Sequence, residues 1–220
     1  IYQTYYPHIT SLLMALFLNV IFFKVDTILL SVMESREIAD TAVALYALPM
    51  KLVEVGMMYG TIFLNSLLPV LTSAIEKKDT EKIKKLTRHA FSLLFIGGVS
   101  ASLFLALFAP WVIRIISTPE FVHTTVLGYS SVDALRIVGW IFLVYFVSSL
   151  YTYILIARGE QRKMMYINAF VALLNISENH LYTAYSFIGS AWVTLVTQIL
   201  LLGLTYVIVQ KVHYLQGSEK

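Results

Sequence analysis

The sequence predicts an all-α, polytopic membrane protein: a bundle of six transmembrane helices. Of its 220 residues, 58% are hydrophobic and 13% are charged, whereas soluble domains carry about a quarter charged residues. The mean hydropathy is +0.76. Four uncharged runs reach the ~20 residues that a spanning helix needs, at 55–75, 91–113, 137–157 and 181–210. This composition excludes an ordinary soluble enzyme and a disordered tail, and the few scattered basic residues exclude a nucleic-acid partner.

Six helices are predicted in order along the chain. Their expected ranges are 8–33, 38–75, 86–116, 131–157, 162–179 and 186–211. The first is apolar apart from Lys24 and Asp26. The second is too long for one crossing at about 1.5 Å per residue, and Pro49 is expected to kink it. The third, fourth and sixth contain long uncharged runs, whereas the fifth is short and continues through polar residues. Because no linker or repeat divides the chain, residues 1–220 are expected to form one lobe.

Catalytic and metal-binding motifs are missing from the sequence. There is no Cys, which excludes disulfides, thiolate catalysis and Cys-ligated metals. The five His are scattered, and no GxxxxGK[ST], HExxH or GxSxG segment occurs. Glycines within the predicted helices instead suit close helix contact or bending: Gly56, Gly60, Gly97, Gly98 and Gly203. We therefore expect no enzyme activity, no cofactor and no metal site, which leaves transport or passive scaffolding.

The loops predict the orientation, because cytoplasmic loops carry an excess of Lys and Arg. The loop at 76–88 holds six basic residues, the loop at 158–163 holds three, and the tail after the last helix holds two. The opposite loops hold only Arg36, Arg114 and Arg136. The eleven basic residues of the first set and the three of the second lie in alternating loops, as six helices require. Both termini are therefore expected in the cytoplasm. The charged run at 76–88 is itself explained as a solvated turn.

Four ionisable residues lie inside the first two predicted helices: Lys24, Asp26, Lys51 and Glu54. Such residues normally face a bundle interior or a water-filled cavity, because they cost a few kcal/mol in the membrane. Asn19 and Asp26 are seven residues apart and share a face that should point into the protein. Lys24 lies about 160° from Asp26, so it must snorkel or meet another helix. Lys51 and Glu54 share a face of the second helix.

Two interpretations of these four residues stay open on the residues alone. They can form neutral ion pairs that pin the first two helices together. Alternatively, they can line a cavity that binds a polar or anionic head group or a coupling ion. Lysine suits a phosphate as a point charge, whereas Asp and Glu suit a proton or Na⁺.

A second polar group lies at the outer end of the fifth predicted helix. It comprises Asn168, Asn175, Glu178, Asn179 and His180. Asn168 and Asn175 are seven residues apart, so they share one face. Interhelical hydrogen bonding with an exposed loop explains this group. Its alternative is a site, for which Asn175, Glu178 and the outer-loop Arg136 are the weaker candidates.

Six segments, in order, carry a family resemblance. They are FFKVDTILLSV, ALYALPMKLVEV, NSLLPVLTSAIEKKDTEKIKKL, ALRIVGW, LIARGEQRKMMYIN and YSFIGSAWVTLVTQ. Together they resemble the second six-helix lobe of polysaccharide repeat-unit flippases of the O-antigen (Wzx) type, within the superfamily of multidrug, oligosaccharidyl-lipid and polysaccharide exporters. Ala44 stands where the family usually has Gly, and Pro49 where it has Ala. Glu178 and His180 replace apolar types in a stretch that lacks the family's Pro.

The resemblance implies a multi-pass protein of the cell inner membrane that flips a polyprenyl-pyrophosphate-linked oligosaccharide repeat unit for surface polysaccharide biosynthesis. Its partners would be the lipid bilayer, the lipid-linked oligosaccharide and the N-terminal lobe of the same transporter. Lys24 and Lys51 would attract the pyrophosphate, while Asp26 and Glu54 would pair with them or carry a coupling ion, H⁺ or Na⁺. The alternatives are an ion-coupled multidrug or metabolite exporter of the same fold, and a non-transporting membrane partner or half-protein.

Overall fold

The computed structural model describes residues 2–118, 120–181 and 185–218, except for the side chains of 2–9, 19, 22, 179–181 and 212–218. Eight helices make up nearly all of this part of the chain. They are α1 (Tyr2–Met33), α2 (Ala39–Glu76), α3 (Thr80–Ile116), α4 (Glu120–His123), α5 (Ser131–Val138), α6 (Ile141–Ala157), α7 (Gln161–Leu181) and α8 (Ser186–Ser218). The predicted all-α class is confirmed.

Four helical segments of the described chain are long and apolar enough to cross a membrane: Ala39–Glu76, Thr80–Ile116, Ser131–Ala157 and Ser186–Lys211. A fifth span results if the two halves of α1, Thr10–Leu18 and Phe23–Met33, are counted together across their 44° bend. These helices establish a polytopic membrane protein, while the number of six spans stays a prediction. The difference between five spans and the predicted six is α7, which has 21 residues but carries many polar side chains.

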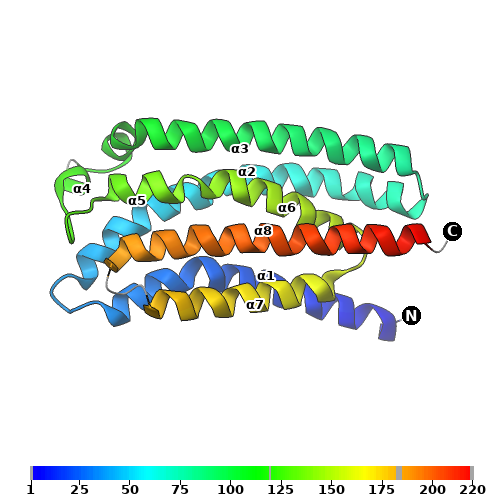
Figure 1. Ribbon diagram of the computed structural model, residues 1–220, viewed down its shortest axis with the longest axis horizontal. Coiled ribbons are helices and arrows are strands. Elements are labelled where there is room, and N and C mark those ends of the chain that lie inside the picture. The colour runs from blue at the N-terminus through cyan, green and yellow to red at the C-terminus, as the bar shows by residue number, and fades with distance from the viewer. Residues whose placement is uncertain (1, 119, 182–184, 219–220) are drawn as a thin grey trace.

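The long helices lie side by side in one bundle (Figure 1). The start of α1, the end of α8 and the turns α2–α3 and α6–α7 lie at one end, while the α1–α2 turn, the end of α7 and the start of α8 lie at the other (Figure 1). Both strongly basic loops of the sequence are therefore at the end where α1 begins and α8 finishes. Inside the bundle, α1 packs mainly on α7, α3 packs on α6, and α8 packs on both α6 and α7.

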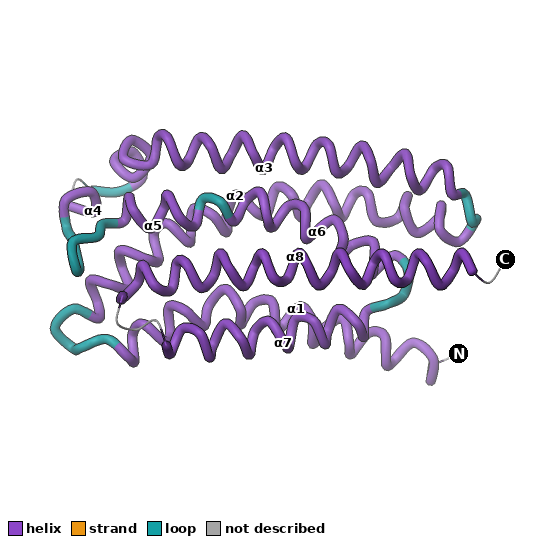
Figure 2. The backbone as a smooth tube through the Cα atoms, viewed as in Figure 1, coloured by secondary structure: helices purple, strands orange, loops and turns teal. Residues whose placement is uncertain are grey.

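Residues 131–157 form one apolar span, Ser131–Ala157, which a short turn at Gly139 and Trp140 divides into α5 and α6 (Figure 2). The buried Ser102 of α3 lies beside the break. Its Oγ donates a hydrogen bond to the Gly139 carbonyl at 2.9 Å and accepts one from the Leu143 backbone N–H at 3.3 Å. Backbone groups left without a helical partner inside a membrane must be satisfied by the protein. Ser102 supplies the acceptor for the Leu143 N–H and a second donor for the Gly139 carbonyl, which also accepts from the Phe142 N–H at 3.3 Å.

Glycines allow the closest helix contacts, as the sequence predicts. A Cβ atom added at Gly56 would lie 2.1 Å from the Phe142 ring, and one at Gly98 would lie 2.8 Å from Leu143 Cα. At Gly56, α2 therefore packs closely on α6, and at Gly98, α3 does the same. Gly203 makes no close helix contact, because nothing lies within 4 Å of a Cβ atom there, so only the bending role predicted for it stays a prediction. Hydrophobic spacing cannot separate a contact glycine from a membrane-facing one.

Candidate functional site

Asp26 of α1 and Tyr46 of α2 lie at equal distances from the turn that joins these two helices. Asp26 lies seven residues before α1 ends, and Tyr46 lies seven residues after α2 begins. At about 1.5 Å per residue, both lie roughly 10 Å from the turn that joins these antiparallel helices. Thr194 is a similar distance from the start of α8, which begins at the same end of the bundle. Three helices therefore bring these side chains to one level.

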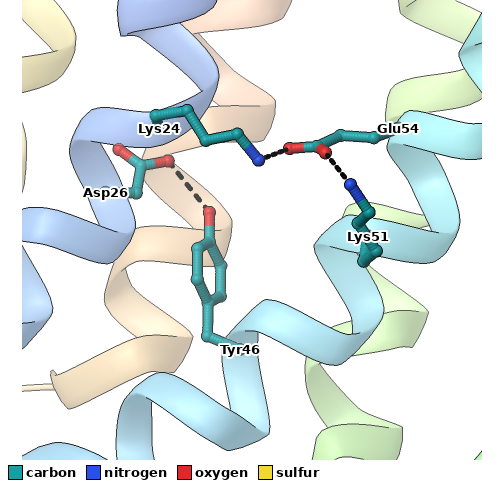
Figure 3. A network of polar contacts seen from close by, with 5 residues as sticks. All are labelled: Lys24, Asp26, Tyr46, Lys51 and Glu54. Carbon is teal, nitrogen blue, oxygen red and sulfur yellow. Dashed lines mark hydrogen bonds and ion pairs between the residues drawn. The ribbon is translucent and has the colours of Figure 1, made fainter.

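Three oxygen atoms meet at this level inside the bundle. Asp26 is completely buried, and its Oδ2 accepts a hydrogen bond from the Tyr46 hydroxyl at 2.9 Å (Figure 3). The Thr194 hydroxyl also donates to Asp26 Oδ2, and it lies 3.0 Å from the Tyr46 hydroxyl. Tyr46 and Thr194 are fully buried too. We call Asp26, Tyr46 and Thr194 the carboxylate–hydroxyl cluster.

A stripe of polar residues on α8 extends this cluster along the bundle interior. Thr197 and Gln198 follow Thr194 within one helical turn and are buried. The Asn175 amide of α7 donates to the Thr197 hydroxyl at 3.3 Å, and the Gln198 amide donates to Ser148 Oγ of α6 at 3.0 Å. The interior of the bundle beside α8 is therefore lined with hydrogen-bonding groups from several helices.

A second group of charges lies on the open side of the α1–α2 pair. Lys24 Nζ lies 2.5 Å from Glu54 Oε1, and Lys51 Nζ lies 3.6 Å from Glu54 Oε2 (Figure 3). The side chains of Lys24 and Lys51 are 52% and 71% exposed, whereas that of Glu54 is 20% exposed. One carboxylate thus lies between two ammonium groups, which leaves one surplus positive charge. We call these three residues the lysine–glutamate cluster.

The structure confirms the opposed directions of Lys24 and Asp26 that their two-residue spacing predicts. Asp26 points into the bundle, while Lys24 reaches across to Glu54 on α2 (Figure 3). Of the two interpretations open on the sequence, the ion pair that links the first two helices is present between Lys24 and Glu54. Asp26, in contrast, accepts hydrogen bonds from two hydroxyl groups.

The other candidates have separate surroundings. The side chain of Asn19 lies outside the described residues, as do those of Asn179 and His180. The Asn168 amide donates to the Ala15 carbonyl of α1 at 3.1 Å, so Asn168 and Asn175 both make the interhelical hydrogen bonds expected of them. Arg136 is about half exposed and lies 4.0 Å from Asp133 on its own helix, so this contact does not connect it to either cluster.

Sequence reasoning missed Tyr46 and Thr194 as partners of Asp26. Tyr46 lies among apolar residues and looks like a core aromatic side chain. The sequence does contain a pattern that indicates a polar face on α8, because Ser190, Thr194 and Gln198 recur every four residues and therefore share a helix face. The contact between Thr194 and Asp26 could not be predicted from this pattern, because these residues are 168 positions apart in the sequence.

A family model decides the class of protein. The MatE model matches residues 11–181, which is well over half of the chain. The chain belongs to the MatE family. Members of this family are membrane transporters rather than enzymes, so the protein is a membrane transporter. Comparison with curated proteins and with solved structures found no match.

The MatE match runs from within α1 to the end of α7 and therefore includes Lys24, Asp26, Tyr46, Lys51 and Glu54. In a transporter of this family, the two clusters differ in what they can bind. In the exposed lysine–glutamate cluster, the two ammonium groups can pair with an anionic group from outside the bundle in place of Glu54. The buried carboxylate–hydroxyl cluster offers only oxygen atoms, which suits a proton or a hard cation.

Proposed function

We propose that this MatE-family transporter flips a polyprenyl-pyrophosphate-linked oligosaccharide repeat unit across the cell inner membrane for surface polysaccharide biosynthesis. The observation that carries the proposal is the lysine–glutamate cluster. Two exposed ammonium groups flank one carboxylate, and an arriving pyrophosphate would take Glu54's place as their partner. Lysine suits a phosphate group as a compact point charge. The residues around this cluster are among those that resemble the polysaccharide repeat-unit flippases.

A partner lobe would complete the cargo site in this proposal. Lys24 and Lys51 lie on the open side of the α1–α2 pair. An N-terminal lobe of the same transporter would cover this side and enclose the head group. Rocking of the two lobes around the cavity would then expose the site to either leaflet in turn. The basic loops and both termini would lie in the cytoplasm.

The carboxylate–hydroxyl cluster would supply the coupling to an ion. A carboxylate in a spanning helix is costly, and a bound proton or cation lowers that cost. Tyr46 and Thr194 provide two further oxygen atoms around Asp26 Oδ2. Movement of H⁺ or Na⁺ onto and off Asp26 would therefore change the charge inside the bundle during each cycle.

The proposal is tested in the host strain with the protein expressed from its own gene. Lys24→Ala combined with Lys51→Ala removes both ammonium groups, and we expect a loss of about tenfold or more in surface polysaccharide, because hydrogen bonds to charged groups contribute about 1.5–3 kcal/mol each. The matched controls are Lys24→Arg and Lys51→Arg, which keep the charge. Normal polymer at a normal membrane level of the double variant would refute the proposal.

A second function rests on the buried Asp26. An ion-coupled exporter of drugs or metabolites with the same fold needs this carboxylate but does not need the two lysines. Efflux of a cationic dye from cells separates the two functions. Dye efflux that is lost in Asp26→Asn and kept in the double lysine variant would establish the exporter instead.

A further inference from the structure

A cavity lies at the outer end of the α7–α8 pair, away from both clusters. Its volume is about 640 Å³, and it shares no lining residue with the carboxylate–hydroxyl or lysine–glutamate cluster. Three aromatic side chains line it: Tyr129 from the turn before α5, Tyr185 just before α8, and Trp192 from the first part of α8. Glu178 of α7 adds a carboxylate, and the remaining walls are glycine and aliphatic residues of α8.

This lining suits an organic ammonium group. The face of an aromatic ring attracts a cation, and rings gathered around a cavity are the usual way to bind an alkylated ammonium. Glu178 supplies the opposite charge at the same place. An anion would need a basic side chain. Among the described residues, the lining has the Glu178 carboxylate, two tyrosine hydroxyls and the Trp192 N–H as polar side-chain groups, and it has no basic side chain.

We propose that this cavity binds the ammonium head group of a zwitterionic membrane lipid. A lipid is proposed because an apolar face of α8 continues from the wall of the cavity. Val196 forms part of its wall and is 44% exposed, and Ile199 continues the same face of α8 at 50% exposure. A lipid whose head group enters between the aromatic rings can lay its acyl chains along this apolar stripe. A soluble ammonium ion would leave the stripe unused.

The test measures lipid binding to the purified full chain by native mass spectrometry. The probes are dioleoyl-phosphatidylethanolamine and its N-acetyl derivative, which keeps the phosphate and the chains but loses the positive charge. We expect the unmodified lipid to bind the wild-type protein better. Trp192→Leu should weaken its binding about twofold to thirtyfold, the range that cation–π contributions of 0.5–2 kcal/mol imply. Glu178→Gln should weaken it as well, because it removes the opposite charge from the cavity.

Matched controls come from similar residues outside the cavity. Glu120→Gln removes an exposed carboxylate of α4, and Trp111→Leu removes an exposed aromatic ring of α3. Both should leave binding unchanged. Equal binding of the N-acetyl lipid, or full binding to Glu178→Gln, would show an ordinary aromatic belt and overturn the proposal. Tetramethylammonium that binds without competition from the lipid would overturn it in favour of a soluble cation.

Discussion

Removing one oxygen atom from Tyr46 tests whether the carboxylate–hydroxyl cluster acts as a unit. The hydroxyl lies 2.9 Å from Asp26 Oδ2 and 3.0 Å from Thr194 Oγ1. Tyr46→Phe keeps the fully buried ring and removes only the donor. A hydrogen bond to a charged group contributes about 1.5–3 kcal/mol, so we expect the free energy of unfolding to fall by about this amount.

The assay is equilibrium unfolding of the purified protein in detergent, followed by tryptophan fluorescence. A matched control is Tyr153→Phe, because the Tyr153 hydroxyl donates to the neutral Asn65 Oδ1 at 2.6 Å from a part-buried position. A neutral bond contributes about 0.5–1.5 kcal/mol, so this variant should lose less stability. The difference between the two variants reports the combined effect of the carboxylate partner and of the complete burial of Tyr46.

A double-mutant cycle with Asp26→Asn then measures the interaction itself. Residues in one hydrogen-bond network show coupling energies of about 0.5–3 kcal/mol, whereas independent sites add within about 0.5 kcal/mol. We expect a coupling of at least about 1 kcal/mol between Tyr46 and Asp26. Additive single and double variants would refute the reasoning, because they would show that the hydroxyl and the carboxylate contribute separately despite their contact.

Three further predictions concern the cation, the packing and the orientation. If Asp26 binds Na⁺, added Na⁺ should raise the stability of the wild-type protein and leave Asp26→Asn unchanged in the same unfolding assay. Gly98→Ala should lower the free energy of unfolding by about 1–3 kcal/mol, because the added methyl group clashes with the Leu143 backbone. The neighbouring Gly97→Ala should be neutral or stabilising, since the nearest atom to its added Cβ is 3.9 Å away. A larger loss for Gly97→Ala than for Gly98→Ala would refute the packing argument. Because the chain has no native Cys, Arg136→Cys should react with an impermeant maleimide on intact cells and Lys84→Cys should not; labelling of Lys84→Cys alone would invert the topology.

The sequence predicts directions within one helix better than partners between helices. The spacing of Lys24 and Asp26 is enough to place them on opposite sides of α1, because 3.6 residues per turn is a local property. The same rule places Lys51 and Glu54 together, and their ion pair confirms it. Local geometry therefore predicted most of the lysine–glutamate cluster.

The carboxylate–hydroxyl cluster could not be predicted in this way. Its members come from α1, α2 and α8, and hydrophobic periodicity does not say which helices become neighbours. The break between α5 and α6 was hidden for a related reason. Gly139 lies just inside an apolar run, and the side chain that satisfies the freed backbone is Ser102 on another helix. Both features depend on tertiary contacts rather than on the local pattern.

The short spacing between Lys24 and Asp26 has a mechanical consequence for the proposed transport cycle. Both residues belong to Phe23–Met33, the half of α1 that follows the 44° bend. A carboxylate that points into the bundle and an ammonium group that points to the open side are therefore fixed to one short helical segment. When that segment changes its orientation, it must displace both groups together. A cation or proton that favours one arrangement around Asp26 thereby acts on the contact between Lys24 and Glu54, which is where we propose that the pyrophosphate binds.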